Sequence, residues 1–229
     1  MARILFQPIE ETSRVFFSKT LSSSSTTPKG LGTAAHILLS LLLLFTHLLL
    51  FLATFGPPYL PLALSILLPL RYHATSAPLI LRAYIYYIPT MAFNGLLEAF
   101  LASTSTPTDL RTQSRWMVIF SIGFIVTAVS LSRYLHWGDA GLVWANIANL
   151  GFRALYAWRF TRRFYIRRGG GELIRWQRML PPPPVFIAFS VAAVVTRWSA
   201  KVHHDMPIYS QLGHVSVGIV CIVGCLITW

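Results

Sequence analysis

The sequence has 229 residues, of which 55% are hydrophobic and only 11% carry a charge. Soluble domains carry about 25% charged residues, so this composition leaves too little polar side chain to cover a surface in water. The formal net charge of +12 would suggest nucleic-acid binding on a soluble fold, but an ordinary soluble domain is excluded. No Asp, Glu, Lys or Arg occurs from Gly30 to Leu70, and a bilayer-spanning helix needs about 20 apolar residues. We therefore expect an all-α integral membrane protein, a polytopic bundle of transmembrane helices.

The predicted elements begin with an amphipathic helix over Met1 to Thr20, which a serine-rich loop ends. The first apolar span follows and is expected to stop at Gly56-Pro57-Pro58. The next apolar stretch, residues 59–70, is short and contains Pro61 and Pro69, so we expect it to lie at the membrane interface. Residues 1–229 are predicted to form a single membrane domain with spans at about 31–55, 79–103, 116–132, 140–158, 185–198 and 212–229.

An arginine-rich segment separates the fourth expected span from the fifth. Seven of the 19 Lys and Arg residues lie between Arg159 and Arg178, and the prolines Pro181–Pro184 follow. Basic loops of membrane proteins face the cytosol. We therefore expect residues 159–184 to form a cytosolic loop that contacts anionic lipid head groups, an interpretation favoured over binding of RNA or DNA.

Polar residues inside two of the expected spans fall on single helix faces. Asn94 and Glu98 are four residues apart, and Asn146, Asn149 and Arg153 follow the spacing i, i+3, i+7. With the arginine-rich loop in the cytosol, Glu98 and Arg153 both lie roughly 8–9 Å below the cytosolic boundary, at about 1.5 Å per residue. One unpaired ion at that depth costs about 2.5–3.5 kcal/mol. We predict that Glu98 and Arg153 face each other or share a wet cavity.

A purely structural role is the alternative for these residues. Asparagine side chains hold membrane helices together at about 0.6 kcal/mol each, but an ion is a poor adhesive, which favours the lining of a cavity. Near the N-terminus, Arg3, Gln7 and Glu10 also share one helix face. Cavity lining and an amphipathic helix on the membrane surface explain that second pattern equally well.

Motifs of hydrolases, metalloproteases and ATP-driven pumps are missing from the sequence, namely G-x-S-x-G, H-E-x-x-H and G-x-x-x-x-G-K-[ST]. His203-His204-Asp205 is a weak metal-binding pattern, because adjacent ligands without a fourth are more often solvated polar residues. The two cysteines, Cys221 and Cys225, provide neither a disulfide framework nor a zinc cluster. We expect no catalytic residue, no metal and no cofactor.

Three stretches together resemble one family of membrane proteins. They share with it an F-Q-P-I-E-E string, an N-G-x-x-E pattern and an A-N-x-x-N-x-G-x-R pattern, in the same order and spacing. The stretches are "ARILFQPIEETSRVFFSK" (Ala2–Lys19), "FNGLLEAF" (Phe93–Phe100) and "GLVWANIANLGFRALYAW" (Gly141–Trp158). In these features the sequence is similar to the Rft-type proteins, which are associated with translocating dolichol-linked oligosaccharide across the endoplasmic reticulum membrane.

The resemblance implies a multi-pass protein of the endoplasmic reticulum membrane that supports protein N-glycosylation. Members of that family look like the multidrug/oligosaccharidyl-lipid/polysaccharide exporters (MOP, which include the MATE transporters), with two helical lobes around a central cavity. They are roughly twice as long as this sequence, which resembles their C-terminal lobe alone, so we expect it to be part of a longer protein. Two other functions stay open: a scaffold that supports N-glycosylation without transport, and an unrelated exporter of drugs or ions.

The resemblance also implies roles for the polar residues. Arg3 and Arg153 would face the diphosphate of the lipid-linked sugar, and Glu98 would hold Arg153 or take up a proton. The candidate cavity residues are Arg3, Gln7, Glu10, Asn94, Glu98, Asn146, Asn149 and Arg153.

The apolar composition makes one prediction that needs no structure. We expect the polypeptide to remain in the membrane pellet after alkaline washing, because its helices are solvated by lipid. Immunoblotting of pellet and supernatant checks this, and recovery in the supernatant would contradict a membrane-spanning fold.

Overall fold

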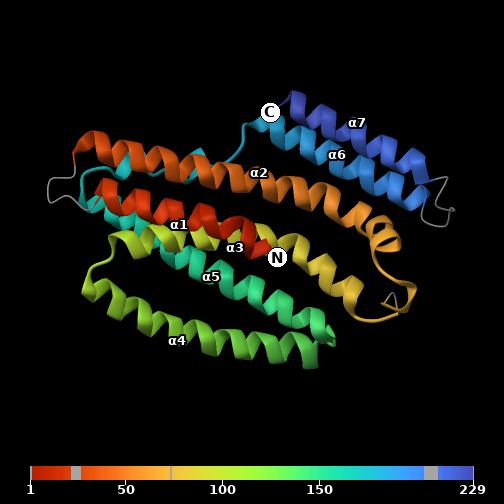
Figure 1. Cartoon of the computed structure of the whole chain (residues 1–229), viewed down its shortest axis with the longest axis horizontal. Helices are drawn as coiled ribbons and strands as arrows, with labels where there is room; N and C mark the ends of the chain where they lie inside the picture. The colour runs from red at the N-terminus through yellow and green to blue at the C-terminus, as the bar shows by residue number, and fades with distance from the viewer. Residues whose placement is uncertain (1, 22–26, 73, 204–210, 229) are drawn as a thin grey trace. The chain divides into compact units, whose positions relative to one another are not determined.

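The computed structural model describes residues 2–21, 27–72, 74–203 and 211–228, without the side chains of residues 2, 3, 5 and 70. All regular structure in these ranges is helical, as expected (Figure 1). The elements are α1 (Ala2–Leu21), α2 (Pro28–Leu67), η1 (Leu70–Tyr72), α3 (Ala77–Thr104), α4 (Pro107–Val129), η2 (Ser130–Tyr134), α5 (Gly138–Arg167), η3 (Gly171–Leu173), η4 (Trp176–Met179), α6 (Pro183–Val202) and α7 (Leu212–Ile227).

Two of the helices, α4 and α6, begin where the sequence supplies a local start signal. Thr106 caps α4: its hydroxyl accepts a hydrogen bond from the Asp109 backbone N–H, and the Asp109 carboxylate accepts one from the Thr106 backbone N–H. This reciprocal capping box satisfies two donors that a helix N-terminus otherwise leaves unpaired. Pro107 and Pro183 occupy the first positions of α4 and α6, where a missing N–H is not needed.

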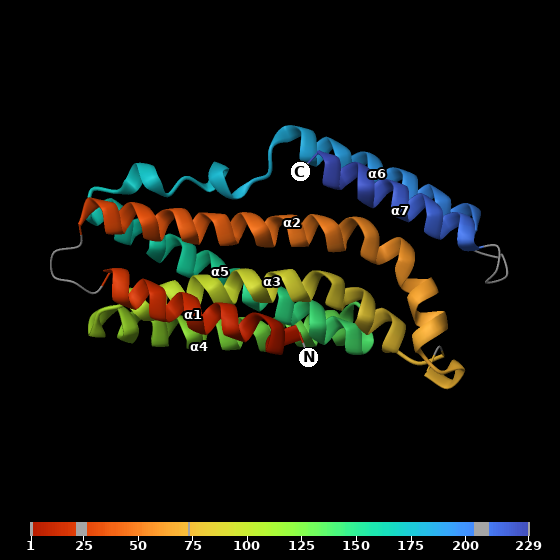
Figure 2. The same cartoon turned by 45° about the horizontal axis from the view of Figure 1, so that its top comes forward.

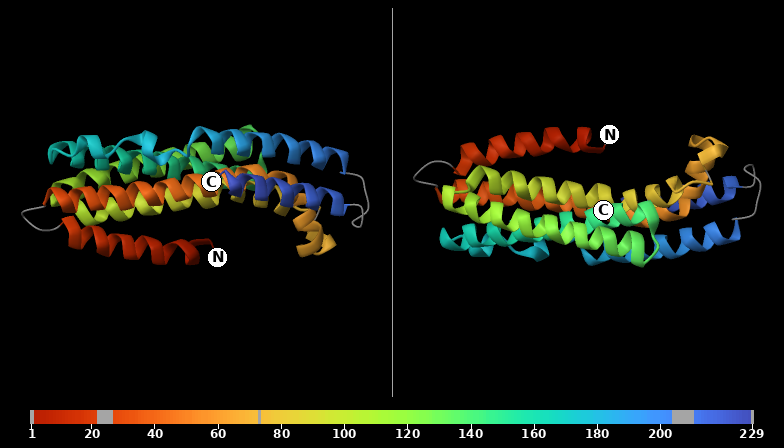
Figure 3. Two further views of the ribbon diagram at one scale, coloured as in Figure 1. Left: turned by 90° about the horizontal axis from the view of Figure 1, so that it is seen from above. Right: turned by 90° about the horizontal axis from the view of Figure 1, so that it is seen from below.

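The chain divides into two compact units, each with its own hydrophobic core. Unit 1 comprises Met1–Phe45 and Tyr87–Leu180, and unit 2 comprises Thr46–Tyr86 and Pro181–Trp229. In unit 2 the antiparallel helices α6 and α7 pack along each other (Figures 2 and 3). Its core is built on five buried side chains, Phe55, Val185, Phe189, Ala192 and Cys225.

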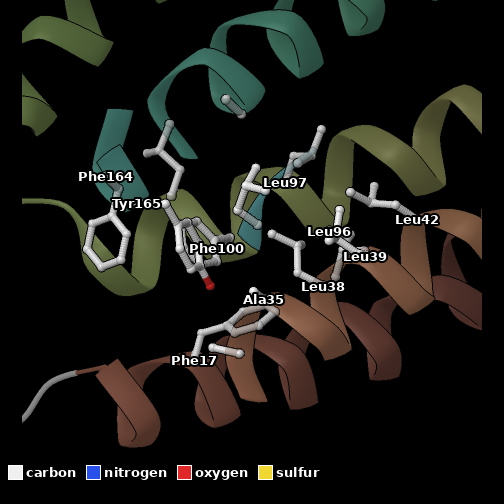
Figure 4. Packing of buried hydrophobic residues seen from close by; sticks show 14 of the residues in the cluster. Phe17, Ala35, Leu38, Leu39, Leu42, Leu96, Leu97, Phe100, Phe164 and Tyr165 are labelled. Carbon is white, nitrogen blue, oxygen red and sulfur yellow. The ribbon is translucent and has the colours of Figure 1, made fainter. Parts of the chain in front are cut away.

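The core of unit 1 is centred on Phe100, which is fully buried (Figure 4). Its ring lies 5.1 Å from that of Phe17 in α1, 5.4 Å from that of Phe164 and 5.8 Å from that of Tyr165 in α5. Aromatic pairs at this spacing contribute about 0.5–1.5 kcal/mol each beyond the burial of their area. These contacts hold α3 against α1 and α5. The polar residues of α3 lie next to this core.

Helix α2 does not end at Gly56-Pro57-Pro58, where the sequence predicts that the first apolar helix stops. It continues to Leu67 with Pro57, Pro58 and Pro61 inside it, and Figure 2 shows the helix bending near its C-terminal end. Proline removes one backbone N–H but has a φ compatible with a helix. Apolar residues continue on both sides of the prolines, so bending the helix costs less free energy than ending it there. The stretch expected at the interface is therefore largely the end of α2.

The arginine-rich segment is also partly helical, which corrects the loop expected over residues 159–184. Helix α5 runs on to Arg167 and ends before Gly169, whose φ of +73° is left-handed. Arginine is a good helix former, and no Gly or Pro interrupts residues 159–168. The remainder contains the short helices η3 and η4 and then Pro181 to Pro184, of which the last two belong to α6.

Three helical stretches of the described residues are long and apolar enough to cross a membrane, judged by length and composition. They are Pro28–Leu67, Pro107–Tyr134 and Gly171–Val202, the last of which comprises η3, η4 and α6. Leu212–Ile227 is apolar but shorter. The segments expected as the second and fourth spans are the helices α3 and α5. That these two cross the bilayer stays a prediction.

The α4–α5 hairpin is tight because its turn requires unusual backbone geometry. The π-helical turn η2 closes α4, and His136 and Gly138 take φ values of +56° and +55°. A Cβ on Gly141, in the first turn of α5, would lie 2.9 Å from the Ser132 backbone nitrogen and 3.0 Å from the Leu131 carbonyl carbon. Only glycine therefore permits this approach.

We expect Gly141→Ala to destabilise the protein by about 1–3 kcal/mol, because backbone atoms must move to admit the methyl group. The free energy of unfolding in mixed detergent micelles measures the change. Gly123→Ala in α4 is the matched control, since a Cβ there meets nothing within 4 Å. It should be neutral or stabilise by up to about 1 kcal/mol. Equal effects of the two substitutions would contradict the close approach at Gly141.

Candidate functional site

A polar cavity of about 240 Å³ lies inside unit 1. Helices α1, α3 and α5 line it together with Phe45 of α2. Apolar side chains such as Phe6, Ile9 and Leu150 form part of its wall. Its polar side chains are Glu10, Tyr87, Asn94, Glu98, Asn146 and Arg153.

Helical periodicity brings these residues together. Tyr87, Met91, Asn94 and Glu98 follow i, i+4, i+7, i+11 along α3, so one face of that helix points into the cavity. On α5 the lining residues Asn146, Leu150 and Arg153 follow i, i+4, i+7. The buried residues Leu96, Leu97, Phe100 and Leu101 of α3 contribute to the core, which holds the polar face of α3 toward α5.

Glu98 and Arg153 form the ion pair predicted from the sequence. The Arg153 Nε donates to Glu98 Oε1 at 2.8 Å, and Nη2 donates to Oε2 at 2.9 Å. The guanidinium and the carboxylate therefore meet with two parallel hydrogen bonds, the strongest geometry for such a pair. Their side chains keep 30% and 20% of their exposure. The pair is thus neither fully buried nor free in solvent, and it opens into the cavity.

Two asparagines give the cavity hydrogen-bonding groups. Asn94 is only 4% exposed, and its Oδ1 has no hydrogen-bond partner among the described residues. An unpaired buried acceptor costs about 1–3 kcal/mol, so this carbonyl favours a water or a ligand hydroxyl in the cavity. Asn146 donates from Nδ2 to the Tyr87 hydroxyl at 3.4 Å, a long bond that leaves its carbonyl available.

Glu10 brings a second carboxylate to the same cavity. It lies directly over Gly95, where a Cβ would be 2.8 Å from Glu10 Oε2. Among the described residues, no hydrogen bond or ion pair involves this half-buried carboxylate. Because glycine has no side chain, position 95 leaves the space that the Glu10 carboxylate occupies.

The other predicted site residues lie elsewhere. The Gln7 side chain is exposed and donates to Glu11 Oε1 at 2.8 Å, and it is not part of the cavity lining. Asn149 does not line the cavity either, although its Oδ1 is buried and unpaired among the described residues. Arg3 belongs to α1, but its side chain lies outside the described residues.

The sequence interpretation missed Tyr87, Met91 and Phe45 as lining residues. A signal for two of them was present, since Tyr87 and Met91 precede Asn94 by seven and three residues and so share its helix face. Phe45 ends a run of apolar residues, Leu41–Phe45, and no such pattern distinguishes it. A metal site is not supported: within the part of the chain that the structure describes, no group of three His, Cys, Asp or Glu residues could hold an ion. Of the weak pattern at residues 203–205, the last two residues lie outside that part.

Comparison with known proteins identifies the relatives of this chain. A family model described as "Rft protein" matches residues 1–229. The chain belongs to the Rft family. The resemblance carried by the F-Q-P-I-E-E string and the two polar patterns is therefore confirmed.

Curated Rft relatives share about a third of their aligned residues with this chain. A Yarrowia lipolytica protein is 37% identical over 173 residues (72% of this chain, 26% of the relative), and a Saccharomyces cerevisiae protein is 33% identical over 165 residues (72% and 28%). A Xenopus tropicalis protein is 31% identical over 228 residues, 97% of this chain and 41% of the relative. All three are named Man(5)GlcNAc(2)-PP-dolichol translocation protein RFT1.

The Rft-family chain thus spans between about a quarter and two fifths of the length of these relatives. No solved structure matches it.

Removing one partner of the ion pair should cost more stability than removing both. We expect Glu98→Gln or Arg153→Gln alone to destabilise unit 1 by about 1–3 kcal/mol, because each leaves one ion uncompensated in a half-buried site. The double variant Glu98→Gln/Arg153→Gln should recover part of that loss, with a coupling energy of about 1–2 kcal/mol. Unfolding in mixed micelles provides the four free energies of the cycle.

The exposed pair of Glu172 and Arg175, with side chains 84% and 56% exposed, is the matched control. Its neutralisation should change stability by less than about 1 kcal/mol. A coupling energy near zero for Glu98 and Arg153 would show that the pair contributes nothing to the fold.

Proposed function

We propose that this chain is part of a multi-pass protein of the endoplasmic reticulum membrane that moves a dolichol-diphosphate-linked oligosaccharide across the bilayer, in support of protein N-glycosylation. Membership of the Rft family supports this proposal, as does the name of the relatives, which specifies Man(5)GlcNAc(2)-PP-dolichol translocation. The observation that carries it at residue level is the Glu98–Arg153 pair opening into a polar cavity.

A translocated diphosphate sugar needs a polar lining inside the membrane. Its phosphates and hydroxyls lose their hydration in hydrocarbon, at a cost that only replacement hydrogen bonds offset. The cavity offers the amide of Asn146, the unpaired carbonyl of Asn94 and the carboxylate of Glu10 to sugar hydroxyls. The polyisoprenoid chain needs no such lining, because it stays in lipid.

Arg153 is the proposed ligand of the diphosphate. Its guanidinium uses Nε and Nη2 for Glu98, and since arginine has five N–H donors, the Nη1 edge stays available to a second anion. Phosphate competes for the same planar fork that carboxylate occupies. We infer that Glu98 holds Arg153 when no substrate is present and is released, or takes up a proton, when the diphosphate arrives.

Translocation requires no covalent step, and we propose that the chain is not an enzyme. The cavity residues bind, orient and release; none is assigned as a nucleophile. As in the exporters with two lobes that the family resembles, this chain would supply one lobe and the rest of the protein the other.

The double variant Glu98→Gln/Arg153→Gln separates a transport role from a structural one. We expect it to fold, because no charge is left unpaired, but to translocate lipid-linked oligosaccharide at least tenfold more slowly, because the diphosphate loses its cation. The rate is measured with the full-length protein in liposomes that contain a labelled dolichol-diphosphate oligosaccharide. Normal transport by a folded double variant would exclude Arg153 as the phosphate ligand.

Two comparisons complete this experiment. Glu172→Gln/Arg175→Gln removes an equivalent pair outside the cavity and should leave the rate unchanged. If the unmodified protein moves no substrate while cells that lack it under-glycosylate a secreted reporter, the protein is a scaffold of N-glycosylation and the transport proposal fails.

A further inference from the structure

A second hollow of unit 1 is chemically different from the cavity around Arg153. It encloses about 530 Å³ and lies along α4 and α5, and we refer to its lining as the α4–α5 groove. From α4 it includes Asp109, Thr112, Trp116 and Phe120, at the spacing i, i+3, i+7, i+11. From α5 it includes the face that runs from Phe152 to Arg167, and the following Arg168. It shares no residue with the polar cavity.

One end of the α4–α5 groove is strongly basic. Arg159, Arg163 and Arg167 succeed one another at i, i+4, i+8 on the face of α5 that lines it, and all three are exposed. Like charges four residues apart repel and destabilise a helix. The described residues provide no ion pair for these three arginines, since the ion pairs found there join Glu98 to Arg153 and Glu172 to Arg175.

Other groups at that end neutralise little of this charge. Among the described residues of the lining, Asp109 is the single acidic one. Its Oδ2 accepts hydrogen bonds from the backbone N–H and the hydroxyl of Thr106, and its charge also attracts Arg167, so one negative charge faces several positive ones. Arg168 adds a fourth positive charge, with its guanidinium 4.2 Å from the centre of the Phe164 ring. The basic end of the groove therefore carries a net positive charge that a bound anion would neutralise.

The other end of the groove is aromatic and apolar. Trp116, Phe120 and Tyr156 form a cluster with ring centres 5.7–6.2 Å apart. Phe152 and Leu155 continue the lining and are 59% and 55% exposed. Tryptophan and tyrosine favour the boundary between head groups and hydrocarbon, and exposed Phe and Leu are matched by acyl chains. Nucleic acid or soluble phosphate would satisfy the arginines but would make no contact with this apolar half of the groove.

We propose that the α4–α5 groove binds one anionic phospholipid of the surrounding membrane. Its phosphate head group lies among Arg159, Arg163 and Arg167, and its acyl chains lie along Trp116, Phe120 and Phe152. Arginine suits the phosphate because its planar fork donates two hydrogen bonds at once. The bound lipid offsets the repulsion along the last turns of α5 and links α4 to α5. This proposal is independent of the transport proposal, because it rests on separate residues.

Lipid binding to the full-length protein in nanodiscs tests the groove. The probes are phosphatidylserine and phosphatidylinositol in a phosphatidylcholine background, and native mass spectrometry counts retained lipids. We expect Arg159→Gln/Arg163→Gln/Arg167→Gln to weaken retention of one anionic lipid roughly hundredfold, since each basic side chain near a lipid surface contributes about fivefold. The matched control, Arg111→Gln/Arg115→Gln/Arg162→Gln, removes the same charge from exposed positions outside the groove and should weaken it less than tenfold.

Each other outcome overturns the proposal. Equal losses in the two triple variants indicate diffuse attraction to an anionic surface, and no loss in the groove variant places the lipid elsewhere. Displacement of the lipid by inorganic phosphate or by duplex RNA at equal concentration shows that the apolar half contributes nothing. Trp116→Ala keeps all the charges but removes the aromatic contact, so undiminished retention of anionic lipid by this folded variant would also overturn the proposal. A failed transport assay leaves these measurements unaffected, and the two proposals therefore fail separately.

Discussion

The bidentate contact between Glu98 and Arg153 is the interaction on which the candidate site depends. A single ion left in this half-buried site costs stability, and the two ions together fix the rotation of α3 and α5 about their axes. Once that rotation is set, Asn94 and Asn146 necessarily face the same cavity, because they share faces with the two ions. The aromatic packing around Phe100 supports the arrangement from the apolar side of α3. Polar and apolar contacts thus specify one and the same helix orientation.

Much of this site was readable from the sequence, and the reason is periodicity. Asn94, Glu98 and Arg153 stand out because their neighbours are apolar, and their spacing assigns each to a helix face. The depth argument then paired the two ions correctly. Gln7 shows the limit of the same reasoning: α1 carries many polar residues, so its pattern does not say which of them points inward, and the Gln7 side chain turns to Glu11 instead.

Helix ends were harder to predict than helix faces. Gly56-Pro57-Pro58 has the composition of a terminator, yet α2 passes through it, because the outcome depends on what surrounds the helix and not on local propensity alone. The arginines after Trp158 were assigned to a loop on account of their charge, although arginine is a good helix former. Their helical continuation creates the α4–α5 groove, since only a regular helix places Arg159, Arg163 and Arg167 in one row. The place of Tyr87 in the cavity lining could be predicted from its spacing to Asn94. The place of Phe45 depends on how α2 packs within unit 1, which the sequence pattern does not show.

The absence of a side chain at Gly95 decides where the Glu10 carboxylate lies. A Cβ at position 95 would be 2.8 Å from Glu10 Oε2, the far end of a flexible side chain. Alanine there would therefore be accommodated by rotation of Glu10, and the acid of α1 would be displaced from its present place in the cavity. A change at position 95 would thus alter the polar lining without replacing any polar residue.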